Sequence, residues 1–140
     1  MRAVMLCVAL LGGGCLSHAE KFGPFKPVAV TCQGSADDLY KRVMRVLSDR
    51  GLSTATSDKD AGVVVSEWES STLMGTEYRY RWRVTVDDGR VVVTSDGQYR
   101  MVDEVLGTGK WQRLTTDQPN ERMDGARALA ADISATSPGV

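Results

Sequence analysis

Three arginines alternate with aromatic residues along one short stretch of the sequence. Arg79, Arg81 and Arg83 occupy every second position of the segment TEYRYRWRV. In an extended strand such residues point to one face and lie about 7 Å apart. Guanidinium groups at that spacing can bind phosphates, lipid head groups or the acidic side chains of a partner. The alternative is a solvated face whose arginines are paired with acids on neighbouring strands.

Residue types that most catalytic and metal sites require are scarce. His18 is the only histidine and lies near the N-terminus, so no histidine triad or histidine-rich metal site is expected in the domain. Cys32, expected as a buried residue at a strand end, is the only cysteine of the predicted domain, which excludes a CxxC motif. Residues 107–110, GTGK, lack the spacing of a phosphate-binding P-loop. The sequence predicts no enzyme, metal or cofactor, although a pair of strand-borne carboxylates stays open as an enzymatic alternative.

The arginine segment belongs to a predicted β-hairpin over residues 76–101. Asp88-Gly89 is a two-residue signal for a type I′ turn, which needs positive φ at both central positions. Counting outward from this turn predicts two opposite-charge pairs that a slip of one residue would lose. These pairs are Arg81 with Asp96 and Glu77 with Arg100.

The same register predicts the surroundings of the arginines. Gln98 is expected opposite Arg79, with Glu67 of the preceding strand on its other side, whereas Arg83 has no predicted carboxylate partner. Three valines are expected to be exposed on the same face, and apolar side chains mixed with arginine favour a contact surface. The predicted partner-binding face consists of Arg79, Arg81, Arg83, Val63, Val65 and Val92.

The opposite face of the hairpin carries a row of large rings. This row is formed by Tyr78, Tyr80, Trp82 and Tyr99. Such a row usually belongs to a core beneath helices, but it can also line a pocket for a small apolar ligand. A cavity beneath the rings would therefore favour a soluble periplasmic carrier over a binding or scaffolding module.

The N-terminus has the features of a bacterial export signal. Arg2 precedes an apolar run over residues 3–11, which is too short to span a membrane. The segment LGGGC ending at Cys15 resembles a lipoprotein signal, in which Cys15 is the lipidated first residue of the mature chain. Cleavage after Ala19 is the alternative and would give an unlipidated periplasmic protein. Leu16, rather than aspartate, after Cys15 fits sorting to the outer membrane.

One domain is expected after this signal. The predicted boundaries are a signal over 1–19, a tether over 20–27, a domain over 28–135 and a disordered tail over 136–140. After loss of the signal the chain is close to neutral, which gives no reason to expect a nucleic-acid partner.

The domain is predicted to follow the order β-α-β-β-β-β-α. Strands are expected over 28–32, 52–56, 62–69 and the two arms of the hairpin, with a loop over 70–75. Ser35 is the expected N-cap of a helix over 36–50, and a second helix begins near Glu121. Residues 102–116 give no clear prediction, and Trp111 has no evident place to be buried. This order predicts an α+β fold, a four- to five-stranded antiparallel sheet with two helices packed on one face.

Several of these features together resemble the helix-grip domain of BamC, an envelope lipoprotein of the outer-membrane β-barrel assembly machinery. They are the export signal with Cys15, the helix over 36–50, the run DAGVVVSEW over residues 60–68 and the arginine-rich strand that follows. The chain differs from BamC in its single domain and short tether. The resemblance implies a non-catalytic binding or scaffolding role in the bacterial envelope, with an envelope protein or lipid head groups as partner.

Overall fold

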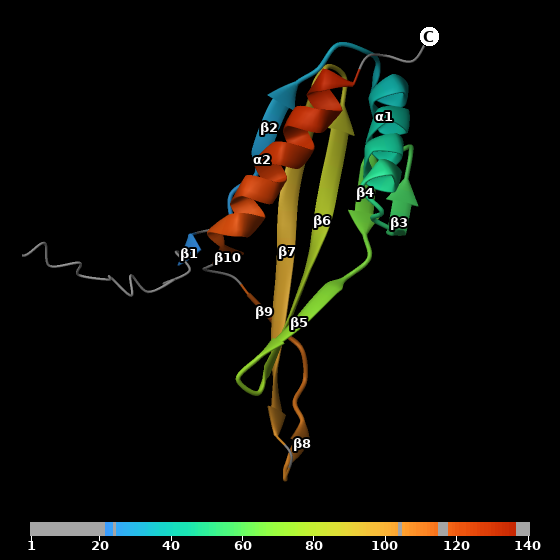
Figure 1. Cartoon of the computed structure of the whole chain (residues 1–140). Coiled ribbons are helices and arrows are strands. Elements are labelled where there is room, and N and C mark those ends of the chain that lie inside the picture. Colours follow the sequence, from blue (N-terminus) through green and yellow to red (C-terminus); the bar gives the residue numbers. More distant parts are fainter. Residues whose placement is uncertain (1–21, 24, 104, 115–117, 137–140) are drawn as a thin grey trace, which may run out of the picture.

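The computed structural model describes residues 22–23, 25–103, 105–114 and 118–136 (Figure 1). Its main sheet is antiparallel with the strand order β2-β7-β6-β4-β3, and β5, β8 and β9 extend it along β6 and β7. Both helices lie on one face of the sheet, which confirms the predicted α+β fold. The elements are β1 (Phe22–Gly23), β2 (Val28–Thr31), α1 (Ala36–Asp49), β3 (Thr54–Asp58), β4 (Val63–Ser66), β5 (Glu69–Leu73), β6 (Thr76–Asp87), β7 (Arg90–Asp103), β8 (Gly107–Thr108), β9 (Gln112–Arg113), β10 (Gln118–Pro119) and α2 (Asn120–Ala135).

The hairpin of β6 and β7 has the register that the Asp88-Gly89 turn predicts. Twelve residue pairs run without interruption from Asp87 opposite Arg90 to Thr76 opposite Met101. Both predicted charge pairs form, Arg81 with Asp96 at 3.2 Å and Glu77 with Arg100. The hairpin is therefore fixed by its turn and by its alternating side chains.

The strand before this hairpin is arranged differently from the prediction. Val64 pairs with Val84 instead of Trp82, and β5 forms its own hairpin with β6 where a loop over 70–75 was predicted. Between β4 and β5 the register shifts by one residue, which is a β-bulge. The Ser66 hydroxyl accepts a 2.8 Å hydrogen bond from the Trp82 N–H and so satisfies a group that the bulge leaves unpaired.

Helix α1 begins and ends as its sequence predicts. The Ser35 hydroxyl accepts a hydrogen bond from the Asp38 N–H at 3.2 Å, and Gly51 has a φ of +71° just past the last turn. Arg42 is buried on the apolar side of this helix, which its sequence did not indicate. Its guanidinium donates to the carbonyl oxygens of Gln33 and Ile133, so it connects α1 to the preceding loop and to α2.

The core lies between the helices and the upper half of the sheet. Apolar side chains of α1 and α2 are buried there against the valines of β4, β6 and β7. The largest fully buried side chains of the helices are Leu39, Val43, Leu47, Leu129 and Ile133.

Beyond the helices the sheet continues as an arm (Figure 1). The arm consists of β5, residues 76–81 of β6, residues 96–103 of β7, β8 and β9. Its β5–β6 turn is Met74-Gly75, with φ values of 48° and 74°. No helix covers the arm, so another layer of side chains must hold it together.

Part of the predicted tether is structured. Residues 22–23 form β1, which pairs with β10, and the Phe25 ring packs against Gly97 of β7. Within the described residues, no helix is both long and apolar enough to cross a membrane. The signal over 1–19, its Cys15 lipidation position and residues 137–140 of the tail lie outside the described residues.

Candidate functional site

Guanidinium groups and indole rings alternate along the arm on the arginine side of the sheet, which is the face opposite the helices. The Trp68 ring lies 4.3 Å from the Arg81 guanidinium and 4.5 Å from that of Arg79. The Trp111 ring lies 4.0 Å from Arg79 and 4.4 Å from Arg100 on its other side. We call the series Arg81, Trp68, Arg79, Trp111 and Arg100 the arginine–tryptophan ladder.

Strand geometry explains why a ring fits between two arginines. Side chains two residues apart on a strand are about 7 Å apart, twice the usual stacking distance of about 3.5 Å. Arg79 and Arg81 of β6 therefore leave space for one flat ring, which Trp68 fills. Cation–π contacts of this kind contribute about 0.5–2 kcal/mol each, so the ladder replaces a conventional core on this face of the arm.

The bulge and the short strand β9 place both tryptophans on this face. The predicted register put Trp68 opposite Tyr78 on the helix side, but the one-residue shift turns it to the arginine side. Gln98 lies opposite Arg79 as predicted, and its side-chain oxygen accepts from Arg79 Nε at 2.9 Å. On the other side of Arg79 the paired residue is Ser70 instead of the predicted Glu67. Trp111 finds its place because β9 pairs with β7 at Gln98 and Tyr99.

Arg79 is the ladder arginine that has a ring on each side. Burial, together with the nearby guanidinium groups of Arg100 and Arg81, lowers the pKa of Arg79. Arginine nevertheless stays charged at neutral pH, because its ordinary pKa is above 12.

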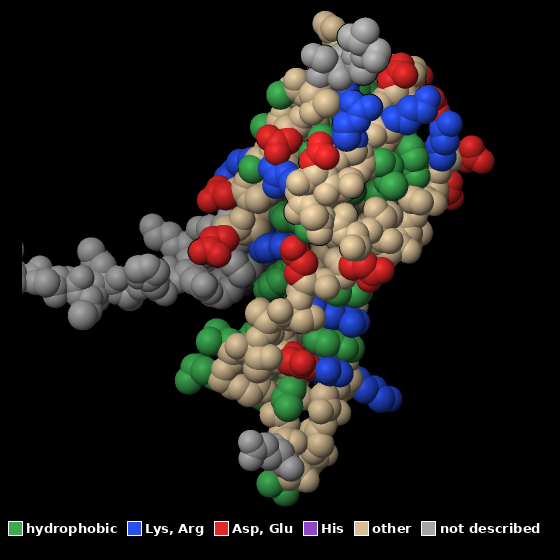
Figure 2. Space-filling view, turned by 45° about the vertical axis from the view of Figure 1, so that its right-hand side comes forward, with side chains coloured by type: hydrophobic (Ala, Val, Ile, Leu, Met, Phe, Trp, Pro, Cys, Tyr) green, Lys and Arg blue, Asp and Glu red, His purple; other side chains and the backbone are tan. Residues whose placement is uncertain are grey.

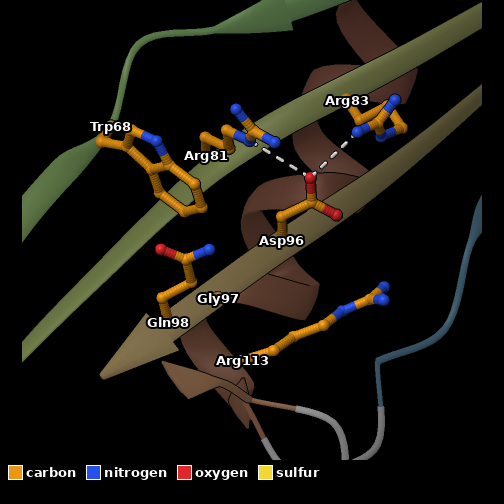
Figure 3. Close-up of a pocket in the computed structure, with 7 residues that line it drawn as sticks. All are labelled: Trp68, Arg81, Arg83, Asp96, Gly97, Gln98 and Arg113. Atoms are coloured by element: carbon orange, nitrogen blue, oxygen red, sulfur yellow. Dashed lines mark hydrogen bonds and ion pairs between the residues drawn. The ribbon is translucent and has the colours of Figure 1, made fainter. Parts of the chain in front are cut away.

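A polar cavity of about 340 Å³ opens beside the ladder (Figure 3). It is lined by Trp68, Arg81, Arg83, Asp96, Gly97, Gln98 and Arg113. Figure 3 shows the Asp96 carboxylate between Arg81 and Arg83, while the Arg113 side chain reaches in from β9. We call this cavity the arginine pocket.

One carboxylate serves two arginines in this pocket. The same Asp96 oxygen accepts from Arg81 at 3.2 Å and from Arg83 at 3.3 Å. Arg83 therefore has the carboxylate partner that the sequence did not predict. Arg113 makes no ion pair with any residue in the described ranges, so the arginine pocket has a net charge of +2. This positive charge contrasts with the net charge of −1 for the whole chain.

The predicted valines are less exposed than the sequence indicated. Val65 is 4% exposed, whereas Val63 and Val92 are half-buried. Val63 and Val65 pair with Thr85 and Arg83, so they do lie on the arginine side of the sheet. They form the upper part of this face, away from the arm.

The predicted aromatic row is packed rather than open. Trp82 is buried beneath α2, where the Arg122 guanidinium stacks on it at 3.8 Å and a Cβ on Gly125 would lie 3.0 Å from the ring. Tyr80 and Phe25 close over Gly97. The row ends in the cross-strand pair Tyr78 and Tyr99, and the Tyr99 hydroxyl donates to Gln112 at 2.7 Å.

The remaining candidate groups are acidic side chains and the Cys32 thiol of the described residues. The described residues contain no group of three or more histidine, cysteine or acidic side chains that could hold a metal ion. Burial raises the pKa of the Cys32 thiol, and the positive charge of Arg42 only partly opposes this.

We expect Arg79→Lys to destabilise the domain by about 1–2 kcal/mol, because an ammonium group cannot stack as a flat plane between two rings. The matched control is Arg83→Lys, which lies outside the ladder and should cost about 0.5 kcal/mol or less. Urea unfolding of both variants measures the difference. Equal effects would show that the ladder does not stabilise the arm.

The comparisons with known proteins address the fold. No protein-family model matches the chain, and no curated protein matches it. The chain is similar to the crystal structure of a DUF4468 family protein from Bacteroides ovatus, with 13% identity and a TM-score of 0.50 over 84% of this chain and 90% of that one. It is also similar to a TBP-like protein from Parabacteroides distasonis, with 20% identity and a TM-score of 0.42 over 65% of this chain. The chain spans 64% of the length of this second protein.

These identities are low, so the likeness to the DUF4468 family protein shows a shared fold alone. Neither structure is described as BamC-like, and the BamC resemblance stays a prediction from the sequence.

Proposed function

We propose that this chain is a non-catalytic bacterial envelope protein, held at the outer membrane by a lipid on Cys15, that binds an anionic group of another envelope component in its arginine pocket. The BamC resemblance motivates the envelope location and the binding or scaffolding role. The observation that carries the binding proposal is the net charge of +2 in a cavity with an indole wall.

The binding role rests on the arginines that the ladder does not use. Arg79, Arg81 and Arg100 have a structural explanation, since they stack on rings to hold the arm together. Arg83 lies outside the ladder with a side chain 42% exposed, and Arg113 is exposed and unpaired among the described residues. These guanidinium groups can donate to a carboxylate or phosphate that enters the pocket.

Asp96 limits how strongly such an anion is bound. Its carboxylate holds Arg81 and Arg83 in place but also repels an incoming negative charge. This arrangement suits reversible recognition rather than permanent capture, because an anion must share the guanidinium groups with Asp96.

The test is titration of the protein with a short glutamate-rich peptide, followed by calorimetry. Asp96→Asn should tighten binding about five- to tenfold, because removal of a like charge at close range changes the binding free energy by roughly 1 kcal/mol. Arg113→Ala should weaken binding by a similar factor.

The matched control is Arg127→Ala, which removes an exposed arginine of α2 that is paired with Asp124 away from the pocket. It should leave the affinity unchanged. If Asp96→Asn and Arg113→Ala also leave it unchanged, the arginine pocket is not the binding site. Thermal unfolding of each variant checks that the fold is kept.

A further inference from the structure

The exposed apolar side chains of this protein gather at one end of the arm. Among the described residues, the large hydrophobic side chains that are exposed all lie in or next to the two turns at this end. They are Leu73, Met74, Met101, Val102, Val105 and Leu106. Figure 2 shows hydrophobic side chains in two places on the lower part of the molecule, one on its left at the level of charged side chains and one at its lowest point. We call this group the apolar tip.

The backbone joins the first of these turns to β7, and the second turn lies further along the arm (Figure 1). The Val102 N–H donates to the Gly75 carbonyl oxygen at 2.8 Å, which joins the end of the β5–β6 turn to β7. Beyond this point β7 continues to pair with β8, so Val105 and Leu106 project furthest along the arm. The Asp103 carboxylate accepts from the N–H groups of Val105 and Leu106 at 2.7 and 2.9 Å, which fixes their turn.

Met74 is an unfavourable residue for its position unless its side chain has a partner. Its φ of 48° is rare for residues other than glycine, asparagine and aspartate, and its side chain is 95% exposed. A type I′ turn at this point would be better served by asparagine. Both the positive φ and the exposure of this apolar side chain to water cost free energy. This combination indicates that the Met74 side chain is covered by a contact.

We propose that the apolar tip inserts into the interfacial region of a lipid bilayer. The exposed apolar side chains are divided between two turns (Figure 2), so they do not form the continuous, complementary patch that a stable protein interface needs. Shallow insertion into a membrane depends instead on apolar area and needs no complementary surface.

The segment between Cys15 and the first described residue, Phe22, is long enough to let the apolar tip face the membrane that holds the lipid. This step rests on the lipid anchor of the proposed function. Phe22 is the seventh residue after Cys15, so at most about 25 Å lie between the lipid and the start of the described chain. Phe25 packs at Gly97, and the six residues from there to Asp103 extend about 20 Å along β7. The lipid and the apolar tip can therefore reach the same membrane surface.

Asp103 limits the depth of insertion. Its hydrogen bonds with the backbone of Leu106 and Val105 lower its pKa, so it remains charged at the tip. A charged carboxylate stays among the head groups, and we expect the apolar side chains to enter only the outer part of the acyl region.

The test uses the mature full-length protein on vesicles of phosphatidylcholine and phosphatidylglycerol that carry bromine at defined acyl depths. Leu106→Trp supplies a reporter indole at the tip, and Ser57→Trp supplies a matched indole on the exposed side of β3, far from it. Wild-type fluorescence is subtracted from both. We expect bromine near the head groups to quench the tip reporter and not the β3 reporter. A Leu106→Trp protein that also carries Met74→Ser and Val105→Ser should show no quenching. Each of these two substitutions lowers the membrane partition coefficient about tenfold.

The outcomes separate the tip from the anchor, because intact mass reports the lipid on Cys15 independently. A quenched tip reporter supports insertion, whether or not the lipid is found. An unquenched tip reporter on a lipidated protein overturns insertion and leaves the anchor in place. In a third outcome, bromine does not quench the tip reporter, and its fluorescence shifts to the blue only when an envelope protein is added. This result also overturns insertion and assigns the tip to a protein partner.

Discussion

Gly62→Ala is expected to destabilise the domain by roughly 4 kcal/mol, a large fraction of the 5–15 kcal/mol typical of a domain. Gly62 ends the turn between β3 and β4 with a φ of +66°. A Cβ built there would overlap the Val86 carbonyl oxygen, far inside van der Waals contact. The clash would also displace the 2.7 Å hydrogen bond from the Val86 N–H to the Gly62 carbonyl.

Gly51→Ala provides a matched control within the same chain. Gly51 has a similar φ of +71°, but no atom lies within 4 Å of a Cβ built there. This variant should lose only the preference of glycine for positive φ, about 1–2 kcal/mol. Urea unfolding midpoints of the two variants separate backbone conformation from steric overlap. Equal losses would show that β4 and β6 move apart easily at Gly62.

Cys15→Ser is expected to move the mature protein from the membrane fraction to the soluble fraction. The physical reason is that a lipid with more than one acyl chain holds a protein on a bilayer, whereas the domain alone has only the small apolar tip. Intact mass of the wild-type protein should show a lipid adduct on a chain that begins at Cys15.

Cys7→Ser is the control for this experiment, because Cys7 lies inside the apolar run of the predicted signal and is removed with it. It should leave both mass and location unchanged. A soluble wild-type protein that begins at Glu20 would contradict the anchor. The arginine-pocket titration would be unaffected by that result, since it needs no membrane.

The ladder, the pocket and the tip all lie on the arm, and the ladder stiffens the arm between the other two. Without helices a hairpin of this kind is only marginally stable. Rings stacked between Arg81 and Arg100 connect the pocket near Asp96 to the strand end near Met101. The ladder variant Arg79→Lys should therefore weaken contacts at both places if the arm must be stiff.

Local sequence was sufficient wherever one short-range rule determined the structure. The Asp88-Gly89 turn and strict alternation determined all the pairs of β6 and β7, because the turn selects the register and a slip of one residue would turn every side chain to the other face. Ser35, the apolar stripe and Gly51 likewise defined α1. The α+β class followed from the order of these elements.

Tertiary structure decided the features that depend on long-range pairing. The bulge after Ser66 turns Trp68 to the arginine side, and one inserted residue leaves no reliable trace in an alternating pattern. The two residues of β9 are too short to show a period, yet they bring Trp111 to Arg79 and Arg113 to the pocket. The sequence by itself therefore determined the row of arginines, through strand alternation. Only the fold decided which of them stack on rings and that Arg83 shares Asp96 with Arg81, because those contacts depend on the bulge, on β9 and on side-chain geometry.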